Sequence, residues 1–305
     1  MNMATLKGQN LRLGIEGAGG EFYVVAMSTG CVITLTNNTE DGTHKDVLGL
    51  ASQPTVVSKS WTLQADSLNV VDAGALLTAI KSMQPLQVMF DETSTTDNKT
   101  AQHATFARKG SAYFNDLTFN FNDRENSTKA IQMTGTGALT NVETGDIYER
   151  LPQDAYTKGQ FVRLYLSSDN TAAPAAVIGA ARQLSLHVSV TLENATTKDT
   201  EGDWQVMEPT AISYDISTTA LVRGNDTITS QVGAKGLADL ETIYQNGTPV
   251  KWKIANTSGA NNRTASSTIV SGSVIIQTLT INGPNRQDAT YTAQLAGYGL
   301  YEVAA

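Results

Sequence analysis

The feature that most constrains this chain is an internal repeat. Residues 7–13 (KGQNLRL) return as residues 158–164 (KGQFVRL), with five of the seven positions identical. The further matches, in chain order, are residues 75–80 with 239–244, Gly110-Ser111 with Gly272-Ser273, and Gly135-Thr136-Gly137 with Gly297-Tyr298-Gly299. Matches that keep their order along a chain indicate a duplicated unit. We therefore expect two tandem domains, residues 1–154 and 155–305.

The length and the apolar content fit this organisation. The chain has 305 residues, of which 40% are hydrophobic. Domains most often contain about 100–150 residues around one core. Each half is therefore long enough to bury a core of its own.

Each copy is expected to be mainly β with one helix. Thr, Val, Ile and aromatic residues alternate with polar ones between Gly and Asn, which is typical of half-buried strands. The expected strands are residues 10–16, 22–27, 31–36, 55–65, 86–91, 112–121 and 128–139, then 160–166, 175–180, 183–193, 210–219, 249–256, 273–282 and 289–301. Helical spacing of apolar residues predicts helices at 72–83 and 235–246. Strands interrupted by one helix predict a β-sandwich or barrel that the helix closes on one side.

Alternation also assigns the faces of these strands. In residues 112–121, the apolar set on one face is Tyr113, Leu117, Phe119 and Phe121. The opposite face carries small, uncharged or acidic side chains, whereas a face that merely meets solvent usually carries more Lys and Glu. This composition indicates a special surface. Its candidate residues are Ser58, Asp116, Thr118, Gln132, Ser213, Asp215, Thr280 and Gln294.

Charge and composition exclude several classes of function. The formal charge of −8 and the pI near 4.9 argue against tight binding of nucleic acid, since phosphates are held by Lys and Arg. The single cysteine, Cys31, excludes an intramolecular disulfide and is expected to be a small buried thiol. The first residues lack the apolar run of a signal peptide, and no stretch reaches the roughly 20 apolar residues of a membrane span. We expect no membrane contact and synthesis in the cytoplasm.

No motif predicts catalysis, a cofactor or a metal site. His44, His103 and His187 lie far apart, without the spacing of metal ligands. The glycine-rich residues 17–20 are followed neither by Lys-Ser/Thr nor by a helix, so a turn is favoured over a phosphate-binding loop. The acidic stretches at 39–42 and 198–203 lack the spacing of calcium loops. We therefore expect no enzyme activity.

The order of these elements resembles the tail tube proteins of long, flexible-tailed bacteriophages. The shared order is an opening Lys-Gly strand, a polar loop, a long strand, one helix and a closing strand pair that ends in Gly-x-Gly. The resemblance implies a structural subunit of the virion tail, assembled in the host cytoplasm, whose sheets join around a ring. Stacked rings would form the tube through which DNA passes during ejection. Implied partners are further copies of the chain and the tape measure, tail tip and terminator proteins.

The resemblance also implies roles for two surfaces. The polar sheet face would line the lumen, where DNA slides past without being held. The polar loops at about 36–53 and 193–208, expected to be without strands, would reach an adjacent ring. Their apolar anchors are Val47, Leu48, Trp204, Val206 and Met207.

The duplication predicts how many chains form a ring. Most subunits of the resembling family carry one domain and form hexamers, so a chain with two domains would fill the same ring with three copies. Two alternatives remain open: the tube protein of a contractile injection device, which shares the fold, and a β-sandwich surface or carbohydrate-binding protein.

Overall fold

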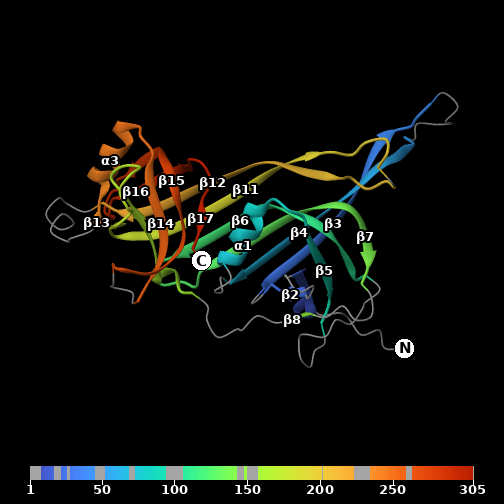
Figure 1. The fold of residues 1–305 in the computed structure, drawn as a ribbon, viewed down its shortest axis with the longest axis horizontal. Helices are drawn as coiled ribbons and strands as arrows, with labels where there is room; N and C mark the ends of the chain where they lie inside the picture. Colours follow the sequence, from blue (N-terminus) through green and yellow to red (C-terminus); the bar gives the residue numbers. More distant parts are fainter. Residues whose placement is uncertain are drawn as a thin grey trace.

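The chain is mainly β, with one α-helix described in each half (Figure 1). This agrees with the expected fold class. The structure is a computed structural model. It describes residues 8–16, 22–25, 28–44, 52–68, 73–93, 106–142, 148–149, 157–200, 202–222, 234–258 and 263–304. The expected domain seam near residue 154, His103 and the glycine-rich residues 17–20 lie outside these ranges.

The described residues of the first half form a short 3-10 turn, eight strands and one helix. In chain order its elements are η1 (Gly8–Asn10), β1 (Leu11–Glu16), β2 (Phe22–Val24), β3 (Ser28–Asp41), β4 (Pro54–Leu68), α1 (Ala73–Ser82), β5 (Leu86–Glu92), β6 (Arg108–Asn122), β7 (Thr128–Asn141) and β8 (Tyr148–Glu149). The helix and strands β4 to β7 lie where helical spacing and alternation predicted them, whereas β3 extends well beyond the expected residues 31–36.

The second half follows nearly the same order. Its elements are η2 (Gly159–Phe161), β9 (Val162–Leu166), β10 (Ala176–Ile178), β11 (Ala181–Asn194), β12 (Met207–Leu221), β13 (Ala234–Lys235), α3 (Leu237–Asn246), β14 (Val250–Thr257), β15 (Ala265–Asn282), β16 (Thr290–Gly297) and β17 (Glu302–Val303). Among the described residues, no helix has the length and hydropathy needed to cross a membrane.

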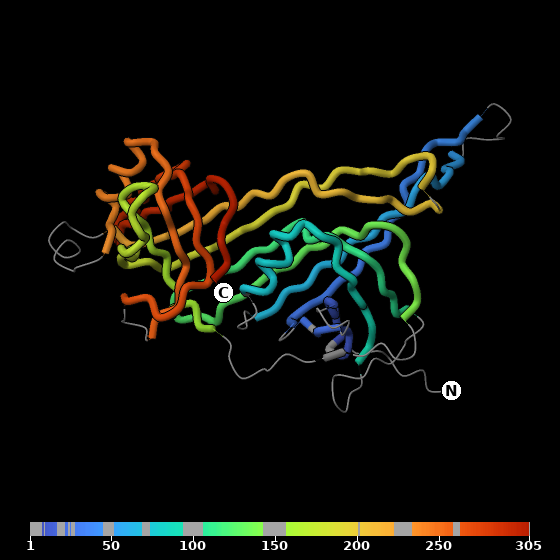
Figure 2. Tube along the Cα trace, in the orientation of Figure 1, coloured from blue at the N-terminus to red at the C-terminus, as the bar shows by residue number. Residues whose placement is uncertain are grey.

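Four long strands of each half join into one continuous antiparallel sheet. The order in the first half is β3-β4-β7-β6, and in the second half it is β11-β12-β16-β15. Strand β6 pairs with β11, which connects the two sets. Figure 2 shows β11 and β12 running from the second half along the first. The outer strands of this eight-stranded sheet are therefore β3 and β15.

The N-terminal parts of β6 and β15 each enter a second group of strands. Strand β6 pairs there with β5, which continues to β1 and β2. Strand β15 pairs with β14, which continues to β9 and β10. The helices close the apolar side: Leu77 and Ile80 of α1 and Leu240 and Ile243 of α3 are buried, at the three-residue spacing of one helix face.

A β-bulge in each half reverses part of the expected face assignment. In β6 the pairing with β7 skips Asn115, between Phe114 and Asp116, and in β15 it skips Gln277. An extra residue shifts the alternation by one, so Phe114 is buried with Leu117, and Tyr113 is not. The prediction that Tyr113 shares a face with Leu117 was wrong for this reason.

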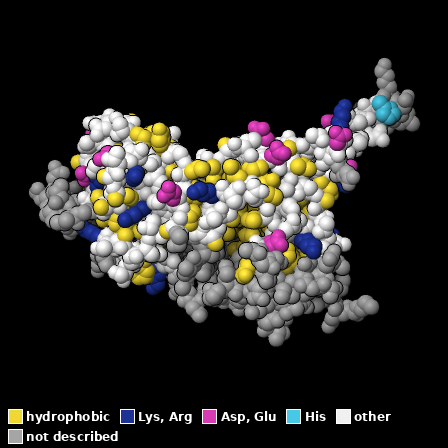
Figure 3. Space-filling model, viewed as in Figure 1, with side chains coloured by type: hydrophobic (Ala, Val, Ile, Leu, Met, Phe, Trp, Pro, Cys, Tyr) yellow, Lys and Arg dark blue, Asp and Glu magenta, His cyan; other side chains and the backbone are white. Residues whose placement is uncertain are grey.

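The loops expected to be without strands are partly strand. Residues 36–41 belong to β3, residues 193–194 belong to β11 and residues 207–208 belong to β12. Each hairpin thus ends in a two-stranded arm, residues 36–44 and 52–58 in the β3–β4 hairpin and residues 193–200 and 202–208 in the β11–β12 hairpin. The β3–β4 arm projects from the molecule and carries charged side chains of both signs (Figure 3).

Candidate functional site: the junction between the halves

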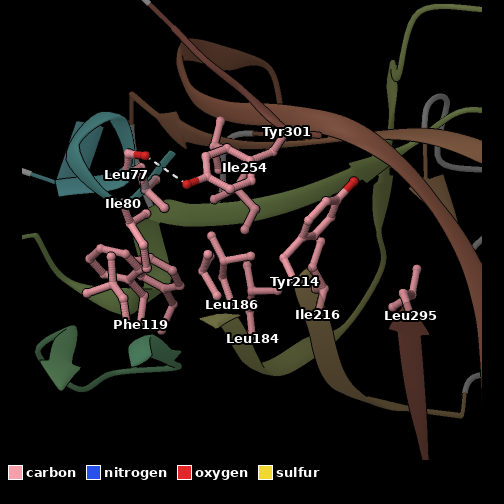
Figure 4. Close-up of a cluster of buried hydrophobic side chains, with 14 of the residues drawn as sticks. Leu77, Ile80, Phe119, Leu184, Leu186, Tyr214, Ile216, Ile254, Leu295 and Tyr301 are labelled. Carbon is pink, nitrogen blue, oxygen red and sulfur yellow. Dashed lines mark hydrogen bonds between the residues drawn. The ribbon is translucent and has the colours of Figure 1, made fainter. Parts of the chain in front are cut away.

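Strands β6 and β11 meet along seven residue pairs, from Asn122 opposite Gln183 to Asp116 opposite Ser189. On one face of this junction the side chains are apolar and each is at most 4% exposed: Leu117, Phe119, Phe121, Leu184, Leu186 and Val188. Figure 4 shows Phe119, Leu184 and Leu186 together in this cluster. Removing these side chains from water holds the two halves together, in addition to the backbone pairing.

Helix α1 extends the contact between the halves. The hydroxyl of Tyr301, close to the C-terminus, donates a hydrogen bond of 2.7 Å to the carbonyl of Leu77 in α1 (Figure 4). The ring of Tyr301 meets that of Tyr214 edge to face, with centroids 5.7 Å apart. Burial raises the pKa of Tyr301, so its hydroxyl stays protonated and can donate this bond.

The other face of the junction is polar and holds His187. Nε2 of His187 lies 2.6 Å from a carboxylate oxygen of Asp116, and Nδ1 lies 2.7 Å from one of Asp215. Burial opposes the charged imidazolium, but the hydrogen bonds to the two carboxylates outweigh it and raise the pKa of His187 above its ordinary value. When charged, the ring donates to both carboxylates and links β6, β11 and β12.

This cluster is not arranged as a metal site. The two nitrogens of His187 point to different carboxylates on either side of the ring, so the three side chains do not converge on one point. Among the described residues, no group of three or more His, Cys, Asp and Glu side chains could hold a metal ion. The sequence analysis treated His187 as an isolated residue, because its two partners are distant in sequence.

The structure brings most candidates for the polar face onto one face of the eight-stranded sheet. Residues directly opposite each other share a face. Asp116 is opposite Gln132 on one side and Ser189 on the other, and Ser189 is opposite Ser213. Thr118 is opposite His187, and His187 is opposite Asp215.

The remaining candidates lie nearer the ends of the sheet. Gln294 is opposite Ser217 and donates to its hydroxyl over 2.9 Å. Thr280, in the outer strand β15, is opposite Thr292. Ser58 lies where the β3–β4 arm leaves the sheet, and its hydroxyl accepts a hydrogen bond of 3.0 Å from Asn38.

Two inter-ring candidates of the second half, Trp204 and Met207, contact the first half of the same chain. Trp204 forms a bridge with Lys59 of β4 and packs against the core. Both the N–H and the carbonyl of Met207 are bonded to the hydroxyl of Thr136. The N–H of Val206 donates to Thr196 of its own loop. Val47 and Leu48 lie outside the described residues, so a contact with an adjacent ring stays a prediction.

Each half packs glycines of neighbouring strands against one aromatic ring. A Cβ on Gly135 would lie 1.9 Å from Trp61, and a Cβ on Gly297 would lie 2.7 Å from Tyr214. The two glycines belong to the Gly-x-Gly matches of the repeat. Gly110 and Gly272 lie on the same two rings, with distances of 3.0 and 2.9 Å.

Comparison with known families identifies the domain type. Residues 157–303 match the model of the phage tail tube protein family. The second half is a phage tail tube domain. This match confirms the expected resemblance and the expected structural role in a tail tube.

Among solved structures, this chain is similar to a chain in the virion of a native gene transfer agent (GTA) particle. The two chains are 16% identical, the match covers 49% of this chain and 99% of that chain, and the TM-score is 0.35. It is also similar to a chain in the tail of an empty GTA particle with C6 symmetry. The identity is 16%, the match covers 48% of this chain and 95% of that chain, and the TM-score is 0.35. The SPP1 tail tube is a third similar structure. The identity is 16%, the match covers 48% of this chain and 78% of that chain, and the TM-score is 0.34. No curated protein sequence matches the chain.

Proposed function

We propose that three chains close into a ring of a phage tail tube and that the junction between β6 and β11 is repeated between chains. In this arrangement β15 of one chain pairs with β3 of the next. The observation that supports it most strongly concerns strand register. Outer strand β3 pairs with β4 as β11 pairs with β12, and outer strand β15 pairs with β16 as β6 pairs with β7.

The strand registers make this correspondence specific. Leu35 of β3 is opposite Trp61, as Val188 of β11 is opposite Tyr214. Strand β15 pairs with β16 as β6 pairs with β7, with a bulge at the matching position in each. Leu279 and Ile281 of β15 therefore correspond to Leu117 and Phe119 of β6. These correspondences support a duplication of one domain.

Burial differs sharply between the junction and its counterparts. Val188 and Phe119 are buried at the junction, whereas Leu35 is 59% exposed and Ile281 is 58% exposed. Pairing of β3 with β15 of a neighbour would cover both side chains. Burial of a Leu or Ile side chain stabilises by roughly 1.5–3 kcal/mol. A heterologous contact of this kind closes a ring if its rotations sum to a full turn.

Two glycines of the repeated KGQ motif support the same contact. A Cβ on Gly159 would lie 2.2 Å from the carbonyl oxygen of Asn122, at the end of β6, so only glycine fits there. The matching Gly8 has nothing within 4 Å of its Cβ position. In the proposed ring, the end of β15 of a neighbour would contact Gly8 in the same way.

In this ring the polar face of the sheet would line the lumen. Helices α1 and α3 pack on the apolar side, so the face with Asp116, Gln132 and Gln294 would point inward. A wall with few Lys and Arg lets DNA pass, because affinity for phosphates grows with each basic contact. The chain would act without a cofactor or catalysis, in the virion tail with the other tail proteins.

Disulfide cross-linking tests both the register and the number of chains. His187 is opposite Thr118, so their counterparts Thr34 and Thr280 should be opposite across the contact between chains. In a Cys31→Ala background, the Thr34→Cys/Thr280→Cys variant should oxidise to covalent dimers and trimers, with closed trimers as the end point. Products larger than trimers, or unlinked chains in assembled rings, would contradict the proposal.

A matched control uses the same two strands out of register. In the proposed register Thr36 lies opposite Thr278, which is four residues from Asn282. The cysteines of a Thr36→Cys/Asn282→Cys variant would therefore lie about 13 Å apart along the strands. Disulfides need Cα atoms within about 7 Å. This pair should therefore assemble into rings but stay unlinked.

A further inference from the structure

The arm formed by the end of the β11–β12 hairpin is seated on the first half of its own chain. The N–H of Gln205 donates to the carbonyl of Lys59 over 2.9 Å, and its carbonyl accepts from the N–H of Gly137 over 2.8 Å. Met207 follows, with its backbone bonded to the hydroxyl of Thr136. Lys59 adds an ion pair of 3.2 Å with Asp203. The arm therefore adds a contact between the halves that is separate from the β6–β11 pairing.

The β3–β4 arm has the same construction. Its loop closes with a hydrogen bond of 2.9 Å from Gly42 to Gln53, and the other loop closes with one of 2.8 Å from Ala195 to Val206. In both loops the second of these residues also donates to a threonine hydroxyl, that of Thr43 over 3.0 Å or of Thr196 over 2.9 Å. The two loops have equal lengths, so Ser52 corresponds to Gln205 and Pro54 to Met207.

The surface that would receive this arm is present in the second half. The strand registers make Ile212 the counterpart of Lys59, and the Gly-x-Gly matches make Tyr298 and Gly299 the counterparts of Thr136 and Gly137. Gly137 and Gly299 share a left-handed backbone, with φ of 75° and 77°. Tyr298 is 54% exposed. A large aromatic side chain is thus left in solvent at the position where Thr136 is half-buried and bonded to Met207.

We infer that residues 52–57 of one chain dock on Ile212, Tyr298 and Gly299 of the next chain in the same ring. Ser52 would take the two backbone hydrogen bonds that Gln205 makes, to the carbonyl of Ile212 and from the N–H of Gly299. The inference rests on the proposed ring. It adds a second contact between neighbouring chains of one ring. Residues 52–57 would then contact a chain of the same ring and not a chain of an adjacent ring.

The side chains at the two places differ in a coordinated way. The backbone N–H and carbonyl of Met207 are bonded to the hydroxyl of Thr136, whereas Pro54 has no N–H to donate and Tyr298 presents a ring. A proline packed on a tyrosine ring buries apolar surface without leaving an unpaired donor. Val56 and Val57, both exposed in the arm, supply further apolar surface. The N–H donor of Met207 and the threonine hydroxyl that accepts from it at Thr136 are thus both absent from the matching positions Pro54 and Tyr298, which fits a contact between these two positions.

Cross-linking of single rings tests the docking site. In the Cys31→Ala background, Pro54→Cys/Tyr298→Cys should join neighbouring chains into trimers in rings that are not stacked. The matched control is Met207→Cys/Thr136→Cys, which should form a disulfide within one chain. A second control, Pro54→Cys/Thr136→Cys, should stay unlinked.

The outcomes separate this inference from the proposed ring. If Thr34→Cys/Thr280→Cys gives trimers but Pro54→Cys/Tyr298→Cys gives none, the ring stands and the docking site is wrong. If Pro54→Cys/Tyr298→Cys links chains only in stacked tubes, the arm joins rings and the inference is overturned. Failure of both pairs in assembled rings would reject the proposed ring itself.

Discussion

Gly135 lies directly beneath the indole of Trp61, so closely that a Cβ at this position would be 1.9 Å from the ring. Trp61 is held there by a hydrogen bond of 3.0 Å from its Nε1 to the carbonyl of Gly137. Tyr214 occupies the same place over Gly297 in the second half. Packing against an aromatic ring therefore explains why the repeat has glycine at positions 135 and 297.

Gly135→Ala should lower the free energy of unfolding by about 1–3 kcal/mol, because the added methyl group forces the indole out of its packed position. Urea unfolding of the single chain measures this. Gly30→Ala is the control, since its Cβ would meet nothing within 4 Å, and it should leave the midpoint nearly unchanged. Combining Gly135→Ala with Trp61→Leu should cost less than the sum of the two single changes. Strict additivity would show that the ring and the methyl group do not compete for space.

Leu35→Asp should abolish rings without unfolding the chain. Leu35 is exposed in the single chain, so its replacement should change the free energy of unfolding by less than about 0.5 kcal/mol. In a ring the carboxylate would face Leu279 in an apolar seam. Size-exclusion chromatography should give single chains for Leu35→Asp and rings for Tyr244→Asp, which alters an exposed residue of α3. Rings of Leu35→Asp would remove β3 from the interface.

The His187 cluster should make the stability of the single chain depend on pH. The folded-state pKa of His187 lies above the unfolded value of about 6.5. Its contribution is therefore full below about pH 6.5 and is lost as the pH rises through the raised folded pKa. Urea unfolding of the Leu35→Asp chain across this range should show the decline, and His187→Gln should remove it. An unchanged pH dependence in His187→Gln would contradict this role.

The contact between chains should lack this pH dependence. The counterparts of Asp116, His187 and Asp215 are Thr278, Thr34 and Thr62, none of which titrates near neutral pH. The dissociation constant of rings should therefore not follow the titration of His187. A loss of rings in the wild type that disappears in His187→Gln would show that the cluster also controls assembly.

Gln132→Lys combined with Gln294→Lys should leave tubes intact and slow genome ejection. Both positions lie on inner strands of the sheet, away from both outer strands, and on the proposed lumen face. Added ammonium groups would bind phosphates, so the delay should grow as salt is lowered. The matched variant with Glu at both positions should eject at the wild-type rate. Equal ejection rates for the Lys and Glu variants would place these residues away from the DNA path.

The sequence predicted the elements that depend on local pattern. The strands at 128–139 and 183–193 follow from two-residue alternation, and the helix at 72–83 follows from the spacing of Leu77 and Ile80. The tail tube resemblance rested on the order of these elements. Local periodicity was enough for both, because each element has a single buried face.

The parts that were missed depend on contacts distant in sequence or on irregular backbone. The bulge at Asn115 leaves no local signal, so Tyr113 was placed on the wrong face. The pairing of β6 with β11 and the partners of His187 arise only after the two halves meet. The arm strands lack the alternation of buried and exposed residues that predicts a strand, because most side chains of residues 36–41 and 193–194 are exposed.

Native mass spectrometry of detached rings tests the central claim most directly. One chain has a mass of 32.5 kDa. The account predicts rings of three chains, with six tube domains around the lumen, and single chains for Leu35→Asp. Rings of six chains would contradict it, because the contact between β15 and β3 could not then copy the junction between β6 and β11.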